Sequence, residues 1–139
     1  MNCTSNAPSV APGRHMSGIT VIGVSVSCAD DSLAAEVRDL LRATDVPTSG
    51  EHSMVVDTRF IGAGYGIPSP GGTAALRRFA AAAGILLDPV YTGKGAHGLL
   101  ELAGEGAFPP GGDVVFLHTG GLPGLFGYPE TMAPEGDPA

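Results

Sequence analysis

Short apolar runs rich in β-branched residues alternate with helix-forming segments along this sequence of 139 residues. The clearest runs are residues 19–27 and 114–118, each of strand length and apolar enough to be buried on both faces of a sheet. Residues 54–56 form a shorter candidate strand. The alternation is typical of an α/β fold in which helices cover a parallel sheet. Because two strong strands make a thin sheet with an exposed edge, the pattern predicts part of a larger domain.

The first predicted helix follows the first apolar run. Asp30 or Asp31 can cap its N-terminus, and Pro47 closes the segment. Its apolar side chains fall on one face at helical spacing, which is typical of a helix packed on a sheet. They are Leu33, Val37, Leu40 and Leu41.

Two more helices are predicted in the second half of the chain. After a glycine-rich loop at residues 62–72, Ser69 is an N-cap with Pro70 in the first helical position, and an alanine-rich stretch follows. Gly84 is the expected end of this helix. A third helix is predicted over residues 92–104, although glycines weaken its first turns. A short turn or helix follows the 114–118 run and reaches residue 126.

The composition excludes several classes of protein. Seven basic against fourteen acidic residues give a net charge of −7, which argues against a nucleic-acid or anionic-membrane surface. No apolar stretch has the length of a membrane span. Cys3 and Cys28 form no zinc or disulfide pattern, and no metal-ligand spacing of histidines occurs, so we expect no metal and a cytoplasmic location. Residues 1–17 and 130–139 are expected to be a disordered leader and tail.

Polar side chains and glycines follow the apolar runs, where parallel sheets bind ligands. Thr119, before Gly120 and Gly121, can present its hydroxyl to a ligand, or the segment can be a plain strand-to-helix turn. Tyr91 and Thr92 stand at a helix N-terminus, which favours anions.

Each of these positions also has a plainer interpretation. Thr92 or Asp88 can simply cap free helix amides. Tyr65, between two glycines, can lie against a ligand or fold back on the core. Lys94 is the sole lysine, and we expect a solvated or phosphate-side role for it rather than a covalent one. His118 is expected to be structural. No G-x-S-x-G elbow occurs, and the dinucleotide fingerprint is incomplete.

Three segments taken in order resemble the D-cysteine desulfhydrases and 1-aminocyclopropane-1-carboxylate (ACC) deaminases. They are GYGIP, GILLDPVYTGK and VVFLHTGGLPGLFGY. The resemblance covers residues 18–128 and implies the C-terminal portion of a three-layer, parallel-sheet α/β domain of the tryptophan-synthase-β type, here truncated and ending near residue 129. These enzymes depend on pyridoxal 5′-phosphate (PLP).

The resemblance also implies roles for individual residues. Thr119 would face the pyridine nitrogen of PLP, with Gly120 beside the ring. Because a neutral hydroxyl leaves that nitrogen largely unprotonated, elimination is favoured over racemisation. Tyr65 and Tyr91 would be catalytic, lining the substrate side as positioning or proton-transfer groups. Thr92, on the cofactor side, stands where ACC deaminases typically carry glutamate, which favours the desulfhydrase-like branch.

The family's Schiff-base lysine and phosphate-binding loop precede the matched region and are not found in this sequence. We therefore expect part of a PLP-dependent lyase or deaminase of a small amino acid, releasing pyruvate, ammonia and sulfide from D-cysteine, that is inactive without an N-terminal half or a homologous subunit. The alternatives are a non-catalytic remnant or regulatory module that associates with an intact homologue, and an independent binder of small anions.

Overall fold

A computed structural model of the chain describes residues 19–27, 32–43 and 54–133. The predicted leader, Asp30, Asp31 and Pro47 lie outside these residues. The elements follow one another along the chain in the order β1 (Val21–Val24), α1 (Ser32–Ala43), β2 (Met54–Asp57), α2 (Pro70–Ala83), α3 (Thr92–Gly104), and two 3₁₀ helices, η1 (Leu122–Gly127) and η2 (Pro129–Thr131).

The two strands form the parallel pair that the alternating pattern predicts. Val21 pairs with Met54 and Val24 with Asp57, and the amide of Ser25 extends the ladder to the carbonyl of Asp57 at 2.8 Å. The predicted burial on both faces was wrong for β1, which is half-buried, and in the neighbouring β2 Val55 is 49% exposed. Two strands of four residues leave edges and faces that neighbouring elements only partly cover.

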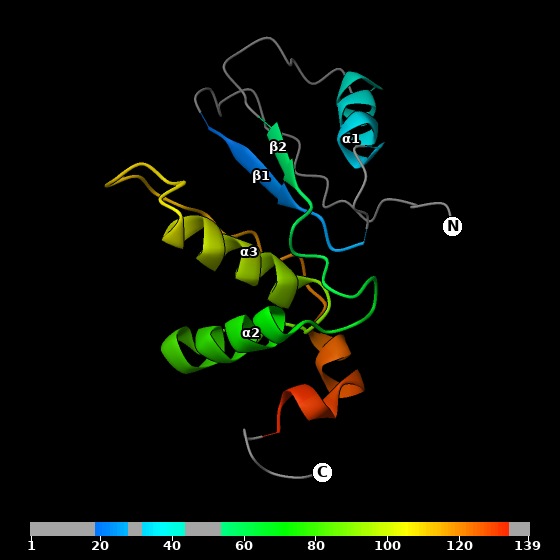
Figure 1. Cartoon of the computed structure of the whole chain (residues 1–139), viewed down its shortest axis with the longest axis vertical. Helices are drawn as coiled ribbons and strands as arrows, with labels where there is room; N and C mark the ends of the chain where they lie inside the picture. Colours follow the sequence, from blue (N-terminus) through cyan, green and yellow to red (C-terminus); the bar gives the residue numbers. More distant parts are fainter. Residues whose placement is uncertain (1–18, 28–31, 44–53, 134–139) are drawn as a thin grey trace.

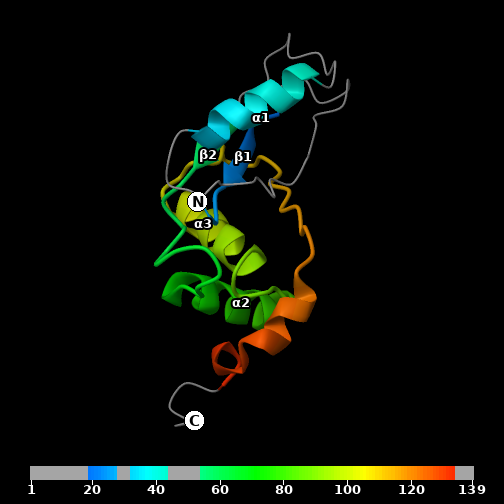
Figure 2. The same ribbon diagram turned by 90° about the vertical axis from the view of Figure 1, so that its right-hand side faces the viewer.

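The elements stack in layers along the long axis of the molecule (Figures 1 and 2). α1 lies on one side of the β1–β2 pair and α3 on the other, with α2 beyond α3. The predicted apolar face of α1 is only half-buried, and Leu40 is 54% exposed. The arrangement is the helix-covered parallel sheet of an α/β fold.

The helix boundaries of α2 and α3 confirm the local signals in the sequence. The Ser69 hydroxyl accepts the Gly72 amide at 3.1 Å, and α2 ends at Gly84 in the left-handed conformation (φ 66°). The glycines that weaken α3 as an isolated helix allow close packing. A Cβ atom on Gly93 would lie 3.1 Å from the carbonyl oxygen of Gly72, and one on Gly98 would lie 2.9 Å from Val24 Cγ2.

The hydrophobic core lies between α2, α3 and the C-terminal segment. Its buried members are Ala75, Leu76, Leu87, Ala96 and Leu125, with Phe79, Leu100 and Phe116 packed against them. Phe79 and Phe116 stack with ring centroids 5.7 Å apart. No helix among the described residues is long and apolar enough to cross a membrane.

The prediction of a buried strand at residues 114–118 was wrong. This segment is extended but pairs with neither strand of the described sheet, and Val115 is 87% exposed. Phe116 packs inward, and His118 Nε2 lies 2.9 Å from the Leu86 carbonyl oxygen. A strand requires a hydrogen-bonded neighbour, and the part of the chain that the structure describes supplies none here.

The C-terminal segment turns back under α2. η1 confirms the predicted short helix after residue 118. η2 and the residues up to Ala133 are ordered against Arg77, whose guanidinium donates to the carbonyl oxygens of Thr131 and Ala133 at 3.3 and 2.7 Å. The structure therefore continues four residues beyond the boundary at 129. Residues 134–139 of the predicted tail lie outside the description.

Candidate functional site

A buried carboxylate organises the N-terminus of α3. Asp88 is 1% exposed, and its oxygens accept the backbone amides of Val90, Tyr91 and Thr92 at 2.7 to 2.9 Å. Charge-assisted bonds to these amides compensate for the burial of the carboxylate. Asp88 thereby fixes the backbone at Tyr91.

Thr92 belongs to the same cap. Its hydroxyl donates to Asp88 Oδ1 at 2.7 Å and accepts the Asp88 amide at 2.9 Å, and the residue is 3% exposed. The plainer sequence interpretation, a side chain that satisfies free helix amides, therefore describes Asp88, and the Thr92 hydroxyl holds that carboxylate in place. Direct contact of Thr92 with a cofactor stays a prediction that this geometry does not favour.

Tyr65 and Tyr91, the two predicted catalytic residues, meet in the structure. Their hydroxyls are hydrogen-bonded to each other, and either can be the donor. The rings stand edge to face with centroids 5.9 Å apart. The hydrogen bond from Tyr65, reinforced by partial burial, raises the pKa of Tyr91 to about 12. Tyr91 therefore stays protonated near neutral pH and can donate its proton to a neighbouring group.

The loop that carries Tyr65 is fixed on both sides. The third tyrosine of the chain, Tyr128, donates its hydroxyl to the carbonyl oxygen of Gly66 at 2.7 Å. Lys94 Nζ donates to the carbonyl oxygens of Ile61 and Gly64 at 2.7 and 2.9 Å. Because Tyr65 itself is 58% exposed, the loop presents its side chain at the surface while the backbone is held.

The expectation of a solvated Lys94 was wrong. The residue is 0% exposed, and its burial lowers the pKa of the ammonium group. Sequence reasoning also missed Tyr128 as part of the site. The glycines around Lys94 suggested an open surface, whereas its ammonium group lies against the carbonyl oxygens of Ile61 and Gly64. The position of Lys94 three residues after Tyr91 was the available signal.

Thr119 and Gly120 lie in an exposed turn beside this cap. Gly120 has a φ of 101°, its amide donates to His118 Nδ1 at 3.1 Å, and nothing lies within 4 Å of the place where its Cβ would be. Gly121 packs directly on the Asp88 carboxylate. The turn is thus anchored to the residue that fixes Tyr91. The structure brings Tyr65 and Tyr91 into contact and gives no contact between Thr119 and either tyrosine.

This turn has the features that a flat aromatic cofactor requires. The Thr119 hydroxyl has no hydrogen-bond partner among the described residues, and the space next to Gly120 is open. These two residues can therefore accept the nitrogen edge and the face of a pyridine ring. The sole lysine of the sequence is bonded to backbone carbonyls, so it is not placed as a covalent anchor for such a cofactor.

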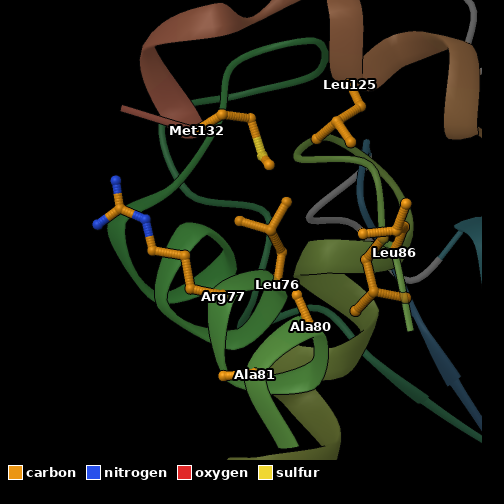
Figure 3. A pocket seen from close by; sticks show the side chains of 8 residues that line it. Leu76, Arg77, Ala80, Ala81, Leu86, Leu125 and Met132 are labelled. Carbon is orange, nitrogen blue, oxygen red and sulfur yellow. The ribbon is translucent and has the colours of Figure 1, made fainter. Parts of the chain in front are cut away.

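An apolar groove adjoins the segment that leads into Asp88. It has a volume of about 340 Å³ and lies between α2, the segment at Leu86, and the C-terminal turns (Figure 3). Leu76, Leu125 and Met132 point toward it, and Arg77 lies at its rim. None of the predicted site residues lines it.

Comparison with known proteins agrees with the resemblance. No family model matches. The chain is 37% identical over 115 residues to the 1-aminocyclopropane-1-carboxylate deaminase of Burkholderia ambifaria (strain MC40-6), covering 79% of this chain and 34% of that protein. It is 36% identical over 117 residues to the Burkholderia lata deaminase, with similar coverage. A crystal structure of an ACC deaminase homologue superposes with a TM-score of 0.66 at 28% identity, covering 80% of this chain and 34% of that one.

The fold matches part of fold type II, the tryptophan-synthase-β-like fold of PLP-dependent enzymes. More particularly, it is a homologue of the ACC deaminases. The chain spans about a third of the length of the curated relatives it matches.

Proposed function

We propose that this chain supplies the substrate side and the ring-nitrogen side of the active site of a PLP-dependent lyase or deaminase that acts on a small amino acid. The observation that carries the proposal is the hydrogen-bonded pair of Tyr65 and Tyr91, which come from a loop and a helix 26 residues apart. Both residues belong to the segments that resemble the family, and the pair lies at the end of a helix anchored by Asp88.

Each residue has a definite chemical task in this proposal. PLP, when bound, withdraws electrons from the α-carbon of an amino acid. Thr119 offers the ring nitrogen a neutral hydroxyl, which leaves that nitrogen largely unprotonated. This state of the ring favours loss of a leaving group. Tyr91 holds its proton at neutral pH because its pKa is about 12, and the pair can donate that proton to the substrate.

The substrate we favour is D-cysteine rather than ACC. The ACC deaminase branch carries a carboxylate after the tyrosine, and this chain has Thr92, whose hydroxyl is engaged by Asp88. The substrate side therefore has no acidic group at this position. Elimination from D-cysteine would release sulfide, ammonia and pyruvate.

The remainder of the domain is the partner that we propose, either as more of the same protein or as a second chain. The 114–118 segment supports this inference, because Val114, Val115 and Leu117 are 46%, 87% and 53% exposed. An extended apolar segment with a free backbone is suited to pairing with a further strand.

Reconstitution tests the proposed function. The chain would be mixed with a separately produced remainder of the Burkholderia ambifaria deaminase and PLP, and then supplied with D-cysteine or ACC. We expect the absorbance of bound cofactor, ammonia and sulfide from D-cysteine, and little ammonia from ACC. A folded complex that binds PLP and releases ammonia from neither substrate contradicts the proposal.

A non-catalytic module that associates with an intact homologue is the second candidate. The exposed 114–118 segment favours it equally, since strand addition requires no chemistry from this chain. Stable binding to the full-length deaminase, together with no turnover in any reconstituted complex, would support this alternative instead.

A further inference from the structure

Lys94 is a buried lysine that has no acidic partner among the residues that the structure describes. Its side chain is 0% exposed, and the two groups that receive its hydrogen bonds are the carbonyl oxygens of Ile61 and Gly64. Burying an amino group is costly, and its removal from water lowers its pKa. A leucine or methionine would fill this space without that cost. What the lysine adds is its hold on the two carbonyl groups.

The two carbonyls belong to the loop that presents Tyr65. The Gly64 carbonyl also accepts the amide of Ile67 at 3.4 Å, which closes a turn around Tyr65 and Gly66. Gly64 has a φ of 144°, a conformation that L-residues rarely adopt. The loop has little regular hydrogen bonding of its own, so the contacts from Lys94 hold the residues on the N-terminal side of Tyr65.

Tyr91 is the N-cap residue of α3, and Lys94 lies in the first turn that follows it. Residues three apart on a helix lie on one face, so a single helix terminus carries both the contact for the loop backbone and the hydroxyl that Tyr65 meets. On the other side of Tyr65, the Tyr128 hydroxyl holds the Gly66 carbonyl at 2.7 Å. The Tyr65 loop is therefore held at the residue before and the residue after the tyrosine.

We propose that Lys94 is a positioning residue that holds the backbone at residues 61–64 and thereby places the Tyr65 hydroxyl against that of Tyr91. The inference rests on the proposed function only for the chemical role of the tyrosine pair. The placement itself is a property of this chain and needs no cofactor.

The chain is suited to a direct test because it contains three tyrosines, one lysine and no tryptophan. NMR on protein with labelled tyrosine rings would follow the contact between the rings of Tyr65 and Tyr91, and phenolate absorbance would give the pKa of Tyr91. We expect Lys94→Met to abolish the ring contact and to shift the pKa of Tyr91 from about 12 toward its usual value of 10. Loss of a positive charge alone would shift that pKa in the opposite direction.

Two further variants separate positioning from general stability. Arg78→Met removes a cation from the exposed face of α2 and should change neither readout. Lys94→Cys, in a background with Cys3 and Cys28 replaced by serine, can be aminoethylated to restore an amine of nearly the same reach. We expect aminoethylation to restore the ring contact and the high pKa, whereas S-propylation, which adds the same length without nitrogen, should not.

The outcomes decide the proposal even if a variant does not fold. In the unaltered chain, the Lys94 ammonium protons should exchange slowly and show contacts to residues 61–64; rapid exchange without these contacts overturns the proposal. A folded Lys94→Met protein that keeps the ring contact and the pKa of about 12 also overturns it. None of these readouts involves PLP or turnover, so failure of the reconstituted enzyme would leave this result unaffected.

Discussion

Gly121 lies directly against the side chain of Asp88: a Cβ atom at position 121 would stand 2.5 Å from Asp88 Oδ1. Gly121 also has a φ of 93°, in the left-handed region that favours glycine. The turn after Thr119 and the cap beneath Tyr91 are therefore in contact, which connects the two halves of the candidate site.

Substitution of Gly121 tests this contact. We expect Gly121→Ala to destabilise the chain by about 2–4 kcal/mol, because it combines backbone strain with a clash against a buried carboxylate. Gly104→Ala is the matched control, since nothing lies within 4 Å of a Cβ there. Urea denaturation measures both. A Gly121→Ala protein as stable as the control would show that the turn does not pack on Asp88.

Removal of the Tyr65 hydroxyl should change the titration of Tyr91. The hydrogen bond from Tyr65 is the largest cause of the raised pKa, so Tyr65→Phe should bring the pKa of Tyr91 from about 12 toward 10. A group whose pKa is raised by folding stabilises the fold at pH values below its pKa in the unfolded state. For Tyr91 this contribution is lost as the pH rises from 10 to 12. Phenolate absorbance and unfolding at alkaline pH measure the two effects. An unchanged Tyr91 titration would exclude the hydrogen bond in solution.

An ion-pair cluster connects β2 to the end of α3 and predicts that the stability of the fold decreases at acidic pH. Arg59 contacts Asp57 at 2.8 Å and Glu105 at 2.7 Å, and its hydrogen bonds lower the pKa of both carboxyl groups. A group whose pKa is lower in the folded state stabilises the fold at pH values above its pKa in the unfolded state. This contribution is lost as the pH falls through its pKa in the folded state. We expect Arg59→Met to reduce the stability of the chain at neutral pH. Below pH 4.5, the usual pKa of glutamate, the stability of this variant should fall less steeply with acid than that of the unaltered chain.

Thermal unfolding of the Arg59→Met protein across the acidic range gives this comparison. Arg42→Met is a suitable control, because the pair of Arg42 and Asp39 lies exposed on the surface of α1. Identical pH profiles for the Arg59→Met protein and the unaltered chain would show that the cluster does not form.

Val115 provides a test of the proposed partner surface. The residue is 87% exposed, so Val115→Lys should change the stability of the chain by less than about 0.5 kcal/mol. If the remainder of the domain covers the 114–118 segment, the same change should weaken its association at least tenfold. Calorimetric titration measures the affinity, and Leu40→Lys on α1, at a residue that is 54% exposed, is a control away from the 114–118 segment.

The sequence predicts those elements whose signals are local. Ser69, Pro70 and Gly84 mark the two ends of α2 without reference to anything distant, and the structure confirms them. The parallel pairing of β1 and β2 follows from the alternation of elements. The 114–118 run was predicted wrongly as a buried strand, because a strand depends on neighbours that its own residues do not specify.

The candidate site shows the same division. From spacing alone, Tyr65 could contact a ligand or fold back on the core, and the resemblance assigned it to the substrate side. In the structure its hydroxyl is hydrogen-bonded to that of Tyr91. Helix capping was predicted for Thr92 or Asp88, and the structure gives it to Asp88, whose carboxylate the Thr92 hydroxyl contacts. The burial of Lys94 was not predicted, because it depends on Ile61 and Gly64, about 30 residues earlier in the chain.

The central claim is that Tyr65 and Tyr91 act together on the substrate of a PLP enzyme. The most direct measurement is the initial rate of sulfide release from D-cysteine by the reconstituted complex, compared among the unaltered chain, Tyr65→Phe and Tyr91→Phe. Our account expects a measurable rate for the unaltered chain and losses of about 10²- to 10⁴-fold for both variants, with PLP still bound. Equal rates for all three complexes would contradict it.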